Sequence, residues 1–81
     1  MDFPYKVYIL RCADGHLYVG CTGNLPERLA RHGRGEVHYT STRLPVECIA
    51  AFGFPGKYKA YNFEKYLKSG SGRAFMSRHL V

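Results

Sequence analysis

The sequence of 81 residues lacks any apolar stretch close to the roughly 20 residues that a membrane-spanning helix requires, so we expect no membrane span. It also lacks internal repeats, low-complexity tracts and any linker long enough to separate two domains, which predicts a single domain over residues 1–81. The start lacks the basic segment and apolar stretch of a signal peptide, which favours a cytoplasmic location. A chain of this length buries only about 60% of its unfolded surface, so its core is thin.

Cysteine is sparse, and its pattern does not suggest a metal site. The three cysteines, Cys12, Cys21 and Cys48, are an odd number, and no two of them form a C-x-x-C pair. A structural zinc site usually requires four closely spaced Cys or His ligands, so we expect none. We interpret these residues as reduced and mostly buried small apolar side chains.

Acidic residues are also few. Six Asp and Glu stand against twelve Lys and Arg, which gives a formal net charge of +6. Such an excess attracts polyanions and steers them to the protein surface. Many small basic proteins never bind nucleic acid, so the charge permits this function class without establishing it.

Two segments rich in β-branched and aromatic residues, Tyr5–Cys12 and His16–Cys21, flank the turn signal Ala13-Asp14-Gly15 and predict a β-hairpin. With a three-residue loop, Tyr8 faces Gly20 and shares one side of the sheet with Tyr18. The other side is then mainly aliphatic and suits a core. A two-residue loop would place the tyrosines on opposite faces, so we prefer the three-residue loop.

The rest of the chain predicts further helices and one more strand. Asn24 caps a helix that runs to about His32, and Glu27 can reach back to complete a capping box. The expected elements that follow are a basic loop over 33–45, a strand over 46–54, a helix over 57–68, a helix-ending segment over 69–72 and a short helix over 73–80. The order β-β-α-β-α-α predicts a small α+β fold.

Several side chains are suited to phosphodiester hydrolysis, which needs a cation, a group that activates water and a means of holding the phosphate. Arg28 has a planar fork that matches phosphate oxygens, and Glu64 is a hard oxygen ligand for magnesium or manganese. Tyr8, Tyr18 and His32 are candidates for handling the proton. Each residue alone also has a simpler interpretation, as a solvated arginine, half of an exposed helix pair, a strand aromatic or a helix end.

The combined spacing is more informative. Val7-Tyr8-Ile9 is followed ten residues later by Tyr18-Val19-Gly20, then by N-L-x-x-R-L-x-x-H from Asn24 to His32, and later by Glu64. This pattern resembles the GIY-YIG nuclease superfamily from about Tyr5 to Leu80, in particular small stand-alone bacterial members related to the N-terminal nuclease domain of an excision-repair protein. The sequence departs from the family where Val7 and Val19 replace Gly and Ile. It departs again at Cys21, where the repair domain usually has a lysine-containing stretch, and in having no Asn after Asn62.

The resemblance implies a three-stranded antiparallel sheet flanked by helices and a metal-dependent endonuclease that hydrolyses DNA. It assigns catalytic positions to Tyr8, Tyr18, Arg28, His32 and Glu64, with Glu64 as the ligand of one Mg²⁺ or Mn²⁺ ion. A metal-associated water attacks the phosphorus in line and leaves 5′-phosphate and 3′-hydroxyl ends, with a motif tyrosine as base. We prefer Tyr18 over Tyr8 for this role. A phenol has a pKa near 10, so the role requires nearby positive charge to lower it.

Nucleic acid is expected to contact residues around this site, namely Gly20, Arg31, Arg34, Arg43, Lys57, Lys59, Lys68 and Arg73. With no extra recognition domain, specificity is expected to be modest, structural or supplied by a protein partner. One alternative is a nucleic-acid-binding module of the same fold with little or no turnover. Another is a small protein that binds a partner through the aromatics Phe54, Tyr58 and Tyr61. The sequence distinguishes neither DNA from RNA nor a monomer from an oligomer.

Overall fold

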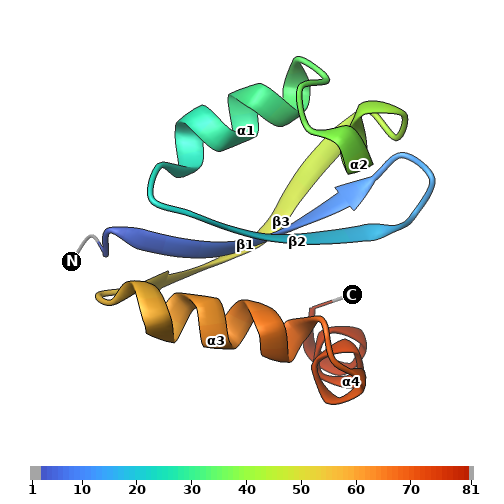
Figure 1. The fold of residues 1–81 in the computed structure, drawn as a ribbon. Coiled ribbons are helices and arrows are strands. Elements are labelled where there is room, and N and C mark those ends of the chain that lie inside the picture. The colour runs from blue at the N-terminus through green and yellow to red at the C-terminus, as the bar shows by residue number, and fades with distance from the viewer. Residues whose placement is uncertain (1–2, 81) are drawn as a thin grey trace.

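The computed structural model describes residues 3–80 and shows a sheet covered by helices on both faces (Figure 1). The sheet is antiparallel, with strand order β2-β1-β3. The expected α+β fold with a three-stranded antiparallel sheet is therefore confirmed. Its elements are β1 (Tyr5–Cys12), β2 (Leu17–Thr22), α1 (Leu25–Gly33), α2 (His38–Ser41), β3 (Val46–Phe54), α3 (Lys57–Leu67) and α4 (Gly70–His79).

The hairpin between β1 and β2 has the expected register. Tyr8 faces Gly20 and Leu10 faces Tyr18. The Cys12 backbone N–H donates to the His16 carbonyl at 2.9 Å, which closes the three-residue loop. The two motif tyrosines therefore lie on one face of the sheet.

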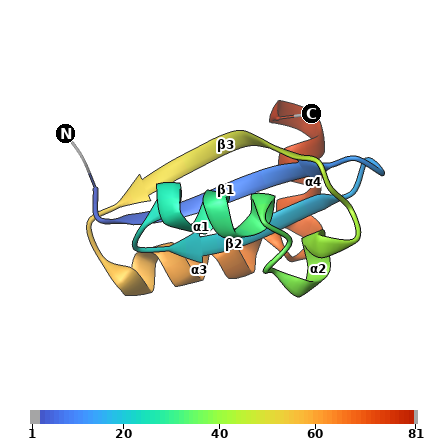
Figure 2. The ribbon, with the colours of Figure 1, turned by 90° about the horizontal axis from the view of Figure 1, so that it is seen from above.

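The opposite, aliphatic face forms the main core. Val7, Ile9 and Val19 are buried there with Ala60 and Leu67 of α3 and with Met76 of α4. Helices α3 and α4 therefore lie below the sheet in Figure 1, while α1 and α2 lie above it. Seen from above, α1 lies across the sheet and α2 lies beside the edge strand β2 (Figure 2).

Local hydrogen bonds at the start of α1 differ from the expected capping box. Asn24 Oδ1 accepts from the Glu27 backbone N–H at 3.2 Å, as expected of an N-cap. The Asn24 N–H, however, donates to Thr22 Oγ1 at 3.0 Å, so the threonine hydroxyl takes the place expected for the Glu27 carboxylate. The helix then ends at Gly33.

Two expected loop segments are helical instead. Residues 38–41, expected to be part of a loop, form α2. The last helix begins at Gly70 and not at residue 73, because Ser69 Oγ accepts from the Gly72 N–H at 3.2 Å and caps it. Gly72 packs so closely on the α3 backbone at Tyr66 and Leu67 that a Cβ would overlap it. Residues 69–72 are therefore the cap and first turn of α4.

The three cysteines have free thiols: Cys12 is buried, Cys21 is partly buried and Cys48 is exposed. None of the helices within residues 3–80 has the length and apolarity needed to cross a membrane.

Candidate active site

Tyr8 lies at the centre of the upper face of the sheet. It is fully buried, and its ring extends beneath Gly20 on the neighbouring strand. A Cβ on Gly20 would lie 2.5 Å from the Tyr8 Oη atom, so only glycine leaves room for the phenol. Gly20, expected to contact nucleic acid, is itself buried, and the structure gives it this packing role.

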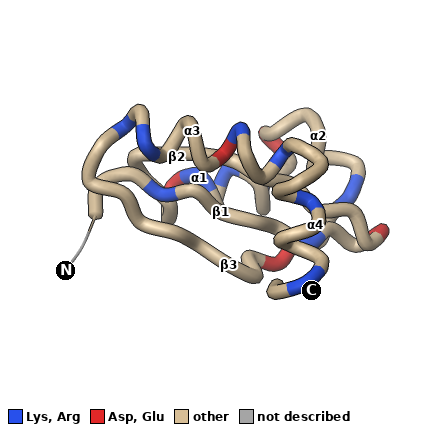
Figure 3. Tube along the Cα trace, turned by 90° about the horizontal axis from the view of Figure 1, so that it is seen from below, with Lys and Arg blue, Asp and Glu red and all other residues tan. Residues whose placement is uncertain are grey.

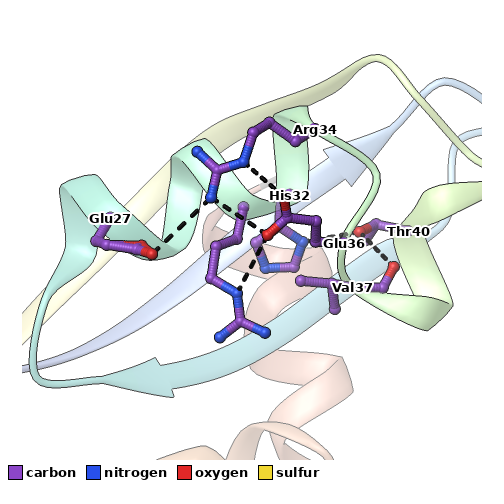
Figure 4. Close-up of polar contacts among 7 residues, drawn as sticks. Glu27, His32, Arg34, Glu36, Val37 and Thr40 are labelled. Carbon is purple, nitrogen blue, oxygen red and sulfur yellow. Dashed lines mark hydrogen bonds and ion pairs between the residues drawn. The ribbon is translucent and has the colours of Figure 1, made fainter.

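A buried hydrogen-bonded chain extends from Tyr8 into the upper helices. Tyr8 Oη lies 2.9 Å from His32 Nε2. His32 Nδ1 in turn lies 2.7 Å from Thr40 Oγ1 (Figure 4). His32 and Thr40 are fully buried where α1 and α2 meet the sheet. The Tyr18 ring packs edge-on against His32, with 5.0 Å between ring centroids, and 5.6 Å from the Tyr39 ring. The structure thus brings Tyr8, Tyr18 and His32 together.

The surroundings keep Tyr8 and His32 uncharged at neutral pH. Burial, and secondarily the neighbouring Tyr18, raise the pKa of Tyr8 to about 12, although Arg28 acts in the opposite direction. Burial also lowers the pKa of His32, and the charges of Arg28 and Arg31 lower it further. The expected lowering of a motif tyrosine pKa therefore does not hold for Tyr8.

Glu64 approaches the site from the other side of the sheet. It belongs to α3, which covers the aliphatic face, whereas Arg28 belongs to α1 on the tyrosine face (Figure 1). Its side chain is 17% exposed and pairs with Lys68 Nζ at 3.0 Å. The expected helix pair is present, and the Glu64 side chain is partly exposed.

The charges of Arg28 and Glu64 nevertheless both affect the pKa of one residue on the edge strand β2, Cys21. Burial raises the pKa of the Cys21 thiol, the Glu64 charge raises it further, and the charges of Arg28 and Lys68 lower it. Cys21 lies on β2, the edge strand of the sheet. Helix α1, which carries Arg28, and helix α3, which carries Glu64, cover opposite faces of the sheet, and the charge of each side chain shifts the pKa of Cys21.

A cavity of about 500 Å³ lies along β2 beside this site. Aromatic rings of Tyr18 and Tyr39 line it together with the cations of Lys68 and Arg73. The remaining lining residues are His16, Leu17, Val19, Leu67, Met76 and Ser77. Flat aromatic surfaces beside cations suit the bases and phosphates of nucleic acid.

Three arginines expected to bind nucleic acid have partners within the chain. Arg34 bonds to Glu36 at 2.7 Å and lies 3.9 Å from Glu27, and Arg31 lies 3.9 Å from the Glu36 carboxylate (Figure 4). Arg43 lies 3.1 Å from Asp14 in the hairpin turn. These contacts partly neutralise the three arginines and give Arg43 a structural role at the turn.

The other expected contacts are spread over the lower helices. Lys57 and Lys59 are exposed at the start of α3, whereas Lys68 follows the end of α3 and Arg73 lies in α4. Figure 3 shows basic positions along α1, α3 and α4. Of these, Lys68 and Arg73 line the cavity with Tyr18.

The donor set fits a magnesium-type ion better than zinc. No group of three or more His, Cys, Asp or Glu side chains within residues 3–80 is arranged to hold a metal. Mg²⁺ binds through one or two carboxylates plus substrate phosphates and keeps several waters, so a single carboxylate such as Glu64 suffices.

Sequence reasoning did not identify Thr40 or Tyr39 as part of the site. Both lie in α2, a helix of four residues, and such a short segment carries no helical periodicity. The signal that could have located Thr40 is the need of a buried His32 for a partner on each ring nitrogen.

Comparisons with known proteins identify the family of the chain. Residues 4–77 match the GIY-YIG catalytic domain, and the chain belongs to this nuclease family. A UPF0213 protein of Streptococcus pneumoniae serotype 4 is 44% identical over 69 residues, covering 84% of this chain and 70% of the relative. One from Natronomonas pharaonis is 44% identical over 70 residues, covering 85% and 82%.

A solved structure also matches. The solution NMR structure of a UPF0213 protein from Bacillus halodurans has a TM-score of 0.58 and 32% identity, covering 91% of this chain and 82% of that one. Among the curated relatives, the chain spans 62% of the length of a Nitratidesulfovibrio vulgaris protein.

Proposed function

We propose that this protein is a metal-dependent endonuclease that hydrolyses DNA phosphodiester bonds and acts as a single domain over residues 1–81. The observation that supports this most is the cavity along β2, which Tyr18, Lys68 and Arg73 line and beside which Glu64 pairs with Lys68 at 3.0 Å. The charges of Arg28 and Glu64 also both shift the pKa of Cys21 on the same strand. Membership of the GIY-YIG family supports it independently. The free thiols favour a reducing compartment, and we propose the cytoplasm.

In this proposal each side chain has one role. Arg28 binds the oxygens of the scissile phosphate through its planar fork. Glu64 holds one Mg²⁺ or Mn²⁺ ion, which when bound polarises a phosphoryl oxygen and makes a coordinated water more acidic. Lys68, now paired with Glu64 at 3.0 Å, is then released toward the cavity that it lines. Tyr18 faces the substrate, because Tyr8 is fully buried.

The nucleic-acid strand is proposed to follow the β2 edge. Tyr18 and Tyr39 offer aromatic surfaces to its bases, and Lys68 and Arg73 offer charge to its phosphates. RNA has the same two features, so the preference for DNA rests on the family. A protein partner remains a proposed source of further specificity.

Cleavage assays with nicked, branched and single-stranded DNA and Mg²⁺ or Mn²⁺ test the proposal. Arg28→Ala and Glu64→Ala are each expected to reduce the cleavage rate by about 100-fold or more, because each removes a group that stabilises developing charge. Arg34→Ala is the matched control, since Arg34 already pairs with Glu36 and should leave the rate nearly unchanged. Cleavage that survives both Arg28→Ala and Glu64→Ala would refute the proposal.

A nucleic-acid-binding module without turnover is a second candidate. The pairing of Glu64 with Lys68 favours it, because the ammonium already satisfies the carboxylate that the ion requires. This candidate predicts binding that weakens steeply with salt and no cleavage with any divalent metal. A partner-binding role finds less support, because Phe54 packs against Phe63 in the core and only Tyr58 and Tyr61 of the three expected aromatics are exposed.

A further inference from the structure

The hydrogen-bonded chain behind the tyrosines has a defined direction. Thr40 Oγ1 lies 3.4 Å from the Val37 carbonyl oxygen, which can only accept, so the Thr40 hydroxyl donates to it. The Thr40 oxygen then accepts from His32 Nδ1 at 2.7 Å, which places a proton on that nitrogen. A neutral imidazole has one N–H, so Nε2 is left as an acceptor for the Tyr8 hydroxyl at 2.9 Å.

We propose that Thr40 is a positioning residue that holds His32 in the Nδ1–H tautomer, so that His32 Nε2 is the proton acceptor behind the two tyrosines. This inference rests on the proposed nuclease function and adds to it the final destination of the proton. Thr40 thereby contributes to the reaction without contacting the substrate itself.

The arrangement answers the difficulty that a buried phenol does not ionise at neutral pH. As the oxygen of the attacking water forms its bond to phosphorus, the water gives a proton to the Tyr18 oxygen. In the proposed relay the Tyr18 proton passes to Tyr8, whose ring centroid lies 6.2 Å from that of Tyr18, and the Tyr8 proton passes to His32 Nε2 at 2.9 Å. The bond from phosphorus to the 3′ oxygen breaks, and that oxygen takes a proton from solvent. His32 ends as an imidazolium and later returns its proton to solvent, so protons and charge balance.

The groups around His32 determine how readily its Nε2 atom accepts a proton. Tyr8 and Tyr18 face it from the sheet, and Arg28 and Arg31 are on its own helix. The hydroxyl of Thr40 faces it from α2. Burial first, and then both arginines, disfavour the imidazolium, which keeps the ring neutral at neutral pH and makes the proton easy to return. Cleavage should therefore decline on acidification, once His32 becomes protonated and Nε2 is blocked.

The tautomer can be measured in the protein itself. Long-range ¹H–¹⁵N correlation NMR on histidine-labelled protein distinguishes a protonated Nδ1 from a protonated Nε2. The wild type is expected to show His32 with Nδ1 protonated at neutral pH, and Thr40→Val to lose this preference. Thr40→Ser, which keeps the hydroxyl, should restore it. Ser41→Ala is the matched control in α2, because Ser41 Oγ donates to the His38 carbonyl at 2.8 Å.

Cleavage kinetics give the second readout. Thr40→Val is expected to lower kcat by about 100-fold with KM nearly unchanged, and Thr40→Ser should recover most of the loss. Wild-type His32 with Nε2 protonated would overturn the proposal without any variant, and so would full kcat in a folded Thr40→Val protein. The NMR result stands even if the wild type cleaves nothing, so failure of this inference and failure of the nuclease proposal are distinguishable.

Discussion

At the scale of single residues, Gly20 determines whether the Tyr8 phenol reaches His32. The phenol passes where a Gly20 side chain would be, with the nearest atoms 2.5 Å from an added Cβ. Gly20→Ala should therefore displace a fully buried ring and lower the free energy of unfolding by about 1–3 kcal/mol. The measurement is urea denaturation, with loss of the Tyr8–His32 hydrogen bond followed by NMR.

Gly33→Ala is the control for this prediction. Gly33 ends α1, and nothing lies within 4 Å of an added Cβ there. Alanine is a better helix residue than glycine, so this variant should be as stable as the wild type or more stable. Equal stability of the Gly20 and Gly33 variants would contradict the close packing of Tyr8.

At the scale of elements, α1 and α3 cover opposite faces of the sheet, and one charged side chain from each shifts the pKa of Cys21 on the edge strand β2. Glu64→Gln should lower the pKa of Cys21, because the carboxylate charge raises it, whereas Arg28→Gln should raise it. The thiolate is the reactive form, so at a pH below the pKa the first variant should be alkylated faster and the second more slowly. The rate at Cys21 is followed by peptide mass spectrometry over a pH series.

Glu47→Gln provides the control, since Glu47 is exposed on β3, the strand at the other edge of the sheet. Unchanged Cys21 reactivity in both the Glu64 and Arg28 variants would mean that these charges do not share the β2 edge. Because the measurement needs neither metal nor DNA, it tests the site independently of cleavage.

The sequence was sufficient to predict the helices and strands whose apolar residues recur with a regular period. The hairpin register, the start of α1 at Asn24 and the bounds of β3 are confirmed. α2 was not predictable, because its four residues are stabilised by tertiary contacts such as the Thr40 hydroxyl on His32 and not by local pattern. The early start of α4 was hidden by glycines, which usually end helices.

The placement of Glu64 shows that a residue's chemistry does not reveal which face of the sheet its helix covers. Arg28 and Glu64 were identified as candidates, but the face that each helix covers depends on packing. Ala60 and Leu67 of α3 bury against the aliphatic face of the hairpin, which puts Glu64 on that side. The apolar positions of this helix were visible in the sequence, and assigning them to the aliphatic face would have predicted the correct side.

At the scale of the whole molecule, the net charge of +6 comes from basic side chains of two kinds. Some are paired with carboxylates within the chain, and others are exposed to a polyanion. Arg31, Arg34 and Arg43 each lie within 4 Å of a carboxylate, and Lys68 pairs with Glu64. Arg73 is exposed and lines the cavity along β2. Nucleic-acid affinity should therefore depend more on the cavity side of the protein than on the paired arginines around α1.

Salt dependence of binding tests this distribution. A residue that neutralises a phosphate releases counterions, so Arg73→Ala should reduce the slope of log affinity against log salt by about 1. Arg34→Ala, which removes an equal charge already bonded to Glu36 at 2.7 Å, should change the slope much less. Fluorescence anisotropy with labelled DNA, with EDTA present and salt varied from about 50 to 200 mM, gives both slopes. A larger reduction for Arg34→Ala than for Arg73→Ala would place the nucleic acid over α1 and away from the β2 edge.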